Sequence, residues 1–146
     1  MVTAGRAQEV EAVLGRLARW AGLRGDIRTL ALVGSWAYGR PRCDSDVDVV
    51  LLTEFPSSYI DSEDWLTSVG GVRLVRTAKW GVTTERRFAL QSGLEVELGV
   101  GASTWARTNP VDEGTRRVVS DGMRVLYDPD GVLEALAAYC GGPPVR

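Results

Sequence analysis

Apolar residues near the start of the chain recur with the spacing of one helical face. They lie between about Ala4 and Leu23, at Val10, Val13, Leu14, Leu17 and the pair Trp20/Ala21. This alternation of three- and four-residue steps is typical of a helix with one buried side. Gly22 and Gly25 favour an end to the helix at this point. We predict an amphipathic helix that packs on another element.

Two short runs further along, Ile27–Val33 and Val47–Leu52, are almost wholly apolar. Runs of this length and composition predict strands that are covered on both faces. Between them lies Gly34–Asp48, with the sequence GSWAYGRPRCDSDVD, in which Ser35–Tyr38 is predicted to form the first turn of a helix. A strand, a turn bounded by glycines and a second strand are therefore expected in this order.

The second half of the chain predicts more strands and one longer helix. Leu94–Val100 alternates between apolar and other residues, which puts Glu95 and Glu97 on one face of a strand. The other expected elements are a loop over Thr53–Ser62, a short helix from Ser62, strands over Val72–Ala78, Val82–Leu90 and Met123–Tyr127, an irregular stretch over Ala102–Pro110, an undecided one over Val111–Val119, and a helix over Val132–Tyr139. Together they predict one domain over residues 1–146 of the α/β (α+β) class, with a mixed β-sheet flanked by helices.

Composition narrows the classes of function. The 146 residues carry a net charge of −2, so bulk electrostatic attraction to nucleic acid is not expected. The chain has no histidine, which excludes histidine bases, histidine triads and histidine-bound zinc. Cys43 and Cys140 match no zinc or redox spacing, and no apolar run approaches the roughly 20 residues of a membrane span. We expect a cytoplasmic protein whose partners are neither membrane nor nucleic acid.

Asp46 and Asp48 are the best candidates for metal ligands. Residues two apart on a strand point to the same face, and such paired carboxylates suit Mg²⁺ or Mn²⁺. A third carboxylate is expected from Glu97, with Glu95 as the alternative, because their strand also carries acids on one face. The simpler interpretation, a solvated end of a strand, does not account for Asp48, which directly precedes a buried run.

The glycines before these acids favour an anion. Gly34 allows backbone N–H groups to approach a phosphate closely, and Ser35 adds a hydroxyl donor. With Gly39, Ser45 and the two aspartates, the stretch resembles the motif of the nucleotidyltransferase fold of the DNA polymerase beta superfamily: Gly-Ser, then Gly, then Asp-x-Asp on the next strand.

The resemblance implies a role for each matching residue. Gly34 and Ser35 would contact the β and γ phosphates of a nucleoside triphosphate, and Asp46 and Asp48 would hold two Mg²⁺ ions. Glu97 would complete the site and accept the proton of the attacking hydroxyl, although aspartate is more frequent there in the family. Gly39, Arg40 and Ser45 complete the expected nucleotide-binding set.

The implied activity is a metal-dependent transfer of a nucleoside monophosphate, AMP from ATP in the first instance, to a hydroxyl. The acceptor stays open between an antibiotic-type small molecule and a partner protein, as in antitoxins that add AMP to another chain. A homo-oligomer that completes the cleft is a further alternative. The competing class is a module on the same core that binds nucleotide or partner without chemistry.

Several cationic and aromatic residues have two interpretations. Arg86 and Arg87 could reach the triphosphate, but a solvated strand face is the favoured interpretation. Trp36, Tyr38 and Trp80 could stack on a base, whereas packing in the core or at its rim is expected for at least two of them.

Overall fold

A computed structural model describes residues 2–42, 44–103 and 122–139, the last four of these by their backbone alone. The undecided stretch Val111–Val119 and the tail Gly141–Arg146 lie outside these residues, as does all but the beginning of Ala102–Pro110. None of the described helices is long and apolar enough to cross a membrane.

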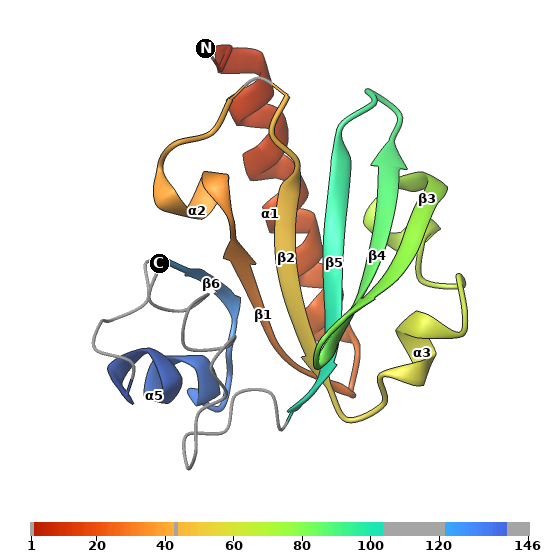
Figure 1. The fold of residues 1–146 in the computed structure, drawn as a ribbon, viewed down its shortest axis with the longest axis vertical. Helices are drawn as coiled ribbons and strands as arrows, with labels where there is room; N and C mark the ends of the chain where they lie inside the picture. The colour runs from red at the N-terminus through yellow and green to blue at the C-terminus, as the bar shows by residue number, and fades with distance from the viewer. Residues whose placement is uncertain (1, 43, 104–121, 140–146) are drawn as a thin grey trace.

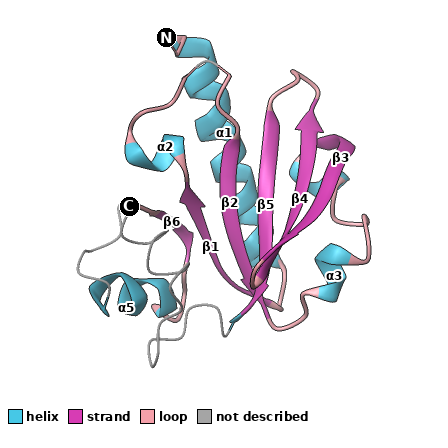
Figure 2. Ribbon diagram, in the orientation of Figure 1, coloured by secondary structure: helices cyan, strands magenta, loops and turns pink. Residues whose placement is uncertain are grey.

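Six strands form one mixed sheet (Figures 1 and 2). Their bounds are β1 Ile27–Val33, β2 Val47–Thr53, β3 Gly71–Trp80, β4 Thr83–Leu90, β5 Glu95–Ala102 and β6 Arg124–Tyr127. The order across the sheet is β3-β4-β5-β2-β1-β6, and only the pairing of β2 with β5 is parallel. The predicted mixed sheet with helices is confirmed, and the predicted strand ends differ by one or two residues, as is usual for such boundaries.

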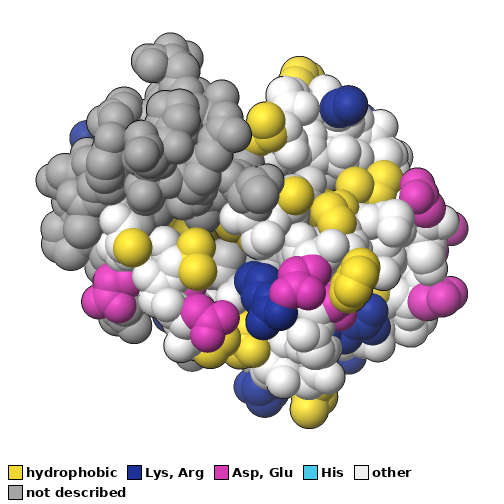
Figure 3. Space-filling view, turned by 90° about the horizontal axis from the view of Figure 1, so that it is seen from below, with side chains coloured by type: hydrophobic (Ala, Val, Ile, Leu, Met, Phe, Trp, Pro, Cys, Tyr) yellow, Lys and Arg dark blue, Asp and Glu magenta, His cyan; other side chains and the backbone are white. Residues whose placement is uncertain are grey.

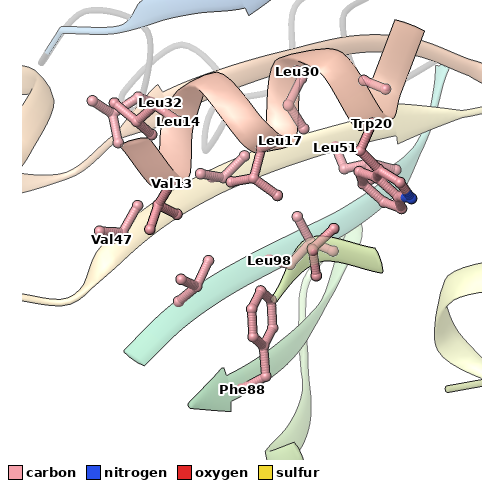
Figure 4. Close-up of a cluster of buried hydrophobic side chains, with 14 of the residues drawn as sticks. Val13, Leu14, Leu17, Trp20, Leu30, Leu32, Val47, Leu51, Phe88 and Leu98 are labelled. Atoms are coloured by element: carbon pink, nitrogen blue, oxygen red, sulfur yellow. The ribbon is translucent and has the colours of Figure 1, made fainter. Parts of the chain in front are cut away.

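Helix α1, Ala4–Leu23, covers one face of this sheet (Figures 1 and 4). The hydroxyl of Thr3 accepts a hydrogen bond from the backbone N–H of Arg6 at 3.1 Å and so caps the first turn. The buried residues of α1 are those that the helical period predicts: Val10, Val13, Leu14, Leu17, Trp20 and Ala21. Because each large side chain of this kind contributes about 2 kcal/mol when fully buried, this face anchors the helix to the sheet.

The strands alternate between the α1 face and the opposite face. On β2, Val47, Val49 and Leu51 belong to the core under α1, whereas Val50 and Leu52 belong to a smaller cluster on the other side. That cluster includes Leu133 of helix α5, Val132–Tyr139, which is the predicted closing helix. The opposite face is therefore covered toward the Leu52 end of β2, and the Asp48 end is where the candidate site lies.

Two predictions about Thr53–Val69 are wrong. A helix, α3 Ser57–Ile60, lies inside the predicted loop, because Pro56 precedes it and the side chain of Tyr59 is fully buried. No helix starts at Ser62. Its backbone carbonyl instead accepts a hydrogen bond from the Trp65 indole at 2.8 Å, and the chain turns into a short 3₁₀ helix, Thr67–Val69.

The described part of the surface carries side chains of all chemical types. Seen from below, apolar, basic and acidic side chains alternate over the described residues (Figure 3). Five large apolar side chains outside the core are the most exposed ones: Leu23, Phe55, Val72, Trp80 and Val82. Of these, Trp80 is the one that borders the candidate site.

Candidate functional site

The turn after β1 brings the backbone close to Asp48. Gly34 has a φ of 76°, a conformation that side chains rarely adopt, and a Cβ at this position would overlap the carboxylate of Asp48. Its carbonyl accepts hydrogen bonds from the backbone N–H groups of Ala37 (2.9 Å) and Tyr38 (3.1 Å), which forms the short helix α2, Ser35–Tyr38. Glycine is therefore the residue that permits this close approach.

The loop after α2 is held against the start of β2. The indole N–H of Trp36 donates to the backbone carbonyl of Ser45 at 3.3 Å. The hydroxyl of Ser45 accepts a hydrogen bond from the backbone N–H of Arg42 at 2.7 Å, and Gly39 ends α2 with a φ of 75°. Ser45 and Gly39 thus shape the loop, and the predicted contact of Ser45 with a nucleotide stays a prediction.

The parallel pairing of β2 with β5 brings the acids together. Asp48 is the register partner of Glu97, so the two side chains lie next to one another on the face opposite α1. The same alternation puts Asp46 and Glu95 on this face. Strands whose sequences are about 50 residues apart therefore contribute to one group of carboxylates.

These acids and the turn border one polar hollow of about 490 Å³. Its lining contains most of the predicted site residues: Ser35, Arg40, Ser45, Asp46, Asp48 and Glu97, joined by Arg42 and Asp44. The predicted residues are brought together in space, with Gly34 beneath Asp48 and Gly39 at the end of α2. Glu95 contacts the group from its edge without lining this hollow.

Two of the acids, Asp48 and Glu97, lie where a negative charge on the carboxyl group is costly, so their pKa values are raised. A hydrogen bond with Asp48, together with burial, raises the pKa of Glu97 to about 8. Burial raises the pKa of Asp48 as well, and its Oδ1 atom is buried without a hydrogen-bond partner among the described residues. Both observations indicate a place where a cation would be favourable.

The protein itself supplies one cation, Arg87 of β4, and sequence reasoning missed it. Its guanidinium pairs with Asp46, with Glu95 at 3.2 Å and with Glu97 at 2.6 Å. The side chain is only 17% exposed, so the predicted solvated strand face is wrong for this residue. The signal was present in the register of the β4–β5 hairpin, in which Arg87 lies directly opposite Glu97.

Arg86 points to the other face and has a structural role. Its guanidinium donates to the Thr77 hydroxyl at 2.7 Å and to the Ser62 carbonyl at 3.1 Å, and it lies over the Trp65 ring at 5.9 Å. The residue is 6% exposed, so a solvated position and a contact with the triphosphate are both wrong for it. Successive strand residues point to opposite faces, which explains why two adjacent arginines differ.

Glu85 is a further acid that the sequence did not single out. It receives hydrogen bonds from Arg76 at 2.9 Å and from the Trp80 indole at 2.8 Å. Burial works against its charge, but these hydrogen bonds, together with those from Glu97 and Arg87, hold the pKa of Glu85 at about 2. The surroundings of Glu85 thus favour its charged form, whereas those of Glu97 raise its pKa.

The donor set suits a hard divalent cation. Asp46, Asp48 and Glu97 offer carboxylate oxygens, the ligands that Mg²⁺ and Mn²⁺ prefer. Among the described residues no three acidic side chains are already arranged around one ion position, and Arg87 is the cation between them. The buried Asp48 Oδ1 atom, which has no hydrogen-bond partner in the described part of the chain, is the observation that fits a metal ligand best.

Comparison with known proteins defines the class of the fold. No protein-family model and no curated protein matches the chain. Among solved structures, a cytoplasmic RNA terminal U-transferase matches with a TM-score of 0.52 and 14% identity, over 82% of this chain and 34% of that one. The Cid1 poly(U) polymerase matches with a TM-score of 0.51 and 12% identity, over 82% of this chain and 35% of that one.

The likeness shows that the chain shares the fold of these two structures, and the predicted nucleotidyltransferase fold is confirmed. The chain spans about a third of the length of the two structures it matches. At such identities the likeness concerns the fold, and the activity has to be argued from the residues of this chain.

Proposed function

We propose that this protein transfers a nucleoside monophosphate from a nucleoside triphosphate to a hydroxyl group. The observation that carries the proposal is the meeting of Asp46, Asp48 and Glu97 beside the Gly34–Ser35 turn, around one polar hollow. The turn after β1, the beginning of β2 and strand β5 converge there, and an arrangement so costly in like charge suits a site that receives a cation and a phosphate ligand.

The hollow would hold the triphosphate by its cationic side. Arg40 and Arg42 line it together with Ser35, so guanidinium and hydroxyl donors face the space in which phosphate oxygens would lie. Asp46, Asp48 and Glu97 would hold Mg²⁺ or Mn²⁺. Such an ion supplies stabilisation of negative charge at the reacting phosphate.

The reaction is an in-line displacement at the α-phosphorus. The acceptor oxygen forms a bond to this phosphorus, the bond from phosphorus to the oxygen that leads to the β-phosphate breaks, and pyrophosphate leaves. Glu97 would take the proton of the acceptor hydroxyl.

The nucleotide donor, the location in the cell and the domain organisation are further parts of the proposal. ATP is the proposed donor, a cytoplasmic location is proposed, and residues 1–146 are proposed to act as one domain. The structural neighbours are named for U-transfer and poly(U) synthesis, so UTP must be compared with ATP.

The test is transfer of label from each of the four α-labelled nucleoside triphosphates, with Mg²⁺ or Mn²⁺, to the components of a cell extract. We expect a labelled product that requires the metal and is lost in Asp46→Asn. Nucleotide binding should be followed in parallel by equilibrium dialysis. Label transfer that persists undiminished in Asp46→Asn would contradict the proposed role of the carboxylates.

Arg87 favours a second candidate, a module that binds nucleotide or a partner protein without chemistry. Its guanidinium already compensates Asp46, Glu95 and Glu97, so the group is stable without a metal. This candidate predicts nucleotide binding without label transfer to any component of the extract. It is excluded by a labelled product that depends on Asp46.

A further inference from the structure

A second hollow adjoins the one proposed for the triphosphate. It measures about 230 Å³ and lies over the face opposite α1, between the end of β1 and the last residue of β3. Its floor is made by Val33, Val50 and Gly99, and Trp80 forms part of its lining. The volume is below the roughly 300 Å³ from which pockets for drug-sized ligands start, so it suits a single ring with its substituents.

Asp48 and Glu97 line both hollows. The two hollows therefore meet at these two carboxylates. If the triphosphate lies among Ser35, Arg40 and Arg42, the second hollow is where an acceptor hydroxyl can reach the α-phosphorus and Glu97 together. This step rests on the proposed function.

The wall made by Trp80 is apolar and held in place. Its indole N–H is engaged by Glu85 at 2.8 Å, yet the residue is 60% exposed. Because the polar atom of the ring already has a partner, the exposed area is mostly carbon. An oriented, exposed indole beside a hollow with an apolar floor is suited to stack on a flat ring.

The charges around this hollow disfavour an anionic ligand. Among the residues that the structure describes, Asp48, Glu85 and Glu97 line it, against one cation, Arg76, which is itself paired with Glu85. The triphosphate in the adjoining hollow would add further negative charge. A phosphodiester chain, which depends on phosphate contacts with cations, is therefore poorly suited to this space.

We propose that this hollow binds the acceptor, and that the acceptor is a hydroxyl-bearing compound with a flat ring that carries no negative charge. A phenol such as a tyrosine side chain has this chemistry, whether it belongs to a partner protein or to a free small molecule. The acceptor oxygen bonds to the α-phosphorus, pyrophosphate leaves, and the hydroxyl proton passes to Glu97.

Gly99 provides a way to close the hollow without straining the fold. A Cβ at this position would make only an ordinary contact, 3.7 Å from the carbonyl of Val49. Like Glu97, it projects from the face opposite α1, so a larger side chain here would fill the floor. Gly99→Leu is therefore expected to fold and to exclude a ring.

The first experiment measures binding and needs no catalysis. Tyramine, N-acetyltyrosinamide and 4-hydroxyphenylacetate share the phenol and differ in charge, and each is titrated into the protein by NMR, as is hexauridylate. We expect tyramine and N-acetyltyrosinamide to bind more tightly than 4-hydroxyphenylacetate. Trp80→Ala should weaken their binding about 3- to 10-fold, the range of an aromatic pair, and Trp80→Phe should retain it.

Matched variants distinguish binding in the hollow from binding elsewhere on the protein surface. Gly99→Leu should abolish phenol binding, whereas Val72→Ala, an equally exposed apolar residue of β3 outside the hollow, should leave it unchanged. Phenol binding that is indifferent to Trp80→Ala overturns the proposal. So does binding of 4-hydroxyphenylacetate as tight as that of tyramine, or binding of hexauridylate that depends on Trp80.

The second experiment separates this proposal from the proposed function. Label transfer from α-labelled nucleotide is measured with the phenols and with a cell extract, in which a labelled protein or a labelled small molecule identifies the source of the acceptor. Phenol binding that depends on Trp80 without any label transfer would support the proposed acceptor hollow and contradict the proposed transferase activity. Label transfer with an acceptor KM that is unchanged in Trp80→Ala would support the proposed transferase activity and contradict the proposal that the acceptor binds in this hollow.

Discussion

Two groups of residues in this protein, one around Asp26 and one around Asp48, give their carboxylates opposite environments. Asp26, before β1, accepts hydrogen bonds from Tyr59 at 2.7 Å and from Thr53 at 2.8 Å, and it pairs with Arg24 at 3.6 Å. Burial alone would raise the pKa of Asp26, but these partners lower it. Asp48, in contrast, has a raised pKa and a buried oxygen without a partner among the described residues.

This difference indicates that the group around Asp26 stabilises the fold, whereas the group around Asp48 does not. The Asp26 group ties β1, β2 and α3 together, and every carboxylate charge in it is compensated. The Asp48 group keeps like charges in contact, which is a feature that natural proteins retain mainly at functional sites. Changes to the two groups should therefore move activity and stability in different directions.

The largest effect is expected from Asp48→Asn. The amide keeps the shape of the side chain but removes one of the adjoining negative charges, so label transfer should fall at least about 100-fold. The melting temperature should stay the same or rise, because the amide costs less to bury than a carboxylate and the repulsion with Asp46 is relieved. The exposed residue Asp64 supplies the control, Asp64→Asn, and a marked loss of stability in Asp48→Asn would contradict the comparison.

Removal of the internal cation comes next. Arg87→Met should destabilise the protein by about 2 kcal/mol, because hydrogen bonds to four carboxylates, those of Asp46, Glu85, Glu95 and Glu97, are lost and their repulsion is exposed. Added Mg²⁺ should raise the melting temperature of this variant more than that of the wild type. Arg28→Met, which breaks the exposed pair of Arg28 with Glu54, is the control and should change stability by less than about 1 kcal/mol.

An equal response of Arg87→Met and wild type to Mg²⁺ would indicate that the carboxylates do not bind the ion. In that case the module without chemistry becomes the better description of the site.

A smaller loss of stability is expected in Asp26→Asn. Loss of the charge weakens the hydrogen bonds from Tyr59 and Thr53 and should cost about 1 to 2 kcal/mol in urea denaturation. Label transfer should stay at the wild-type level, since this group borders neither hollow. A loss of transfer in the folded variant would break the division between the two groups; Asp61→Asn, at an exposed position, controls for the substitution itself.

The smallest effect concerns pH. The pKa of Asp26 is lowered in the folded state from the ordinary 3.8, so its contribution to stability is complete above that value and is lost as the pH falls through the folded pKa. The difference in unfolding free energy between wild type and Asp26→Asn should therefore shrink in strongly acid solution. A difference that grows on acidification would contradict the assigned direction.

The sequence predicted most elements because their patterns are local. The helical period of α1 and the alternation in β5 each express one buried face, and both are confirmed. The helix α3 was missed because its stability comes from Tyr59, whose hydroxyl bonds to an aspartate 33 residues away. Contacts of this kind leave no periodic trace in the sequence.

The candidate site divides in the same way. Gly34, Ser35, Asp46 and Asp48 lie in one stretch of chain, and the sequence by itself predicted them as candidates because the turn and the strand are both local. Glu97 could be chosen only by analogy between strands until the parallel pairing of β2 with β5 brought it to Asp48.

Only the tertiary structure showed that Arg87 is the cation beside the carboxylates and that Trp80 lines the second hollow. Arg87 faces the carboxylates while Arg86, its neighbour, is buried behind the sheet, and this choice depends on the register of β4 with β5. Trp80 borders the second hollow because β3 and β4 pair as they do. The sequence thus determined which groups can act, and strand register, a property of pairing between distant segments, determined which of them meet.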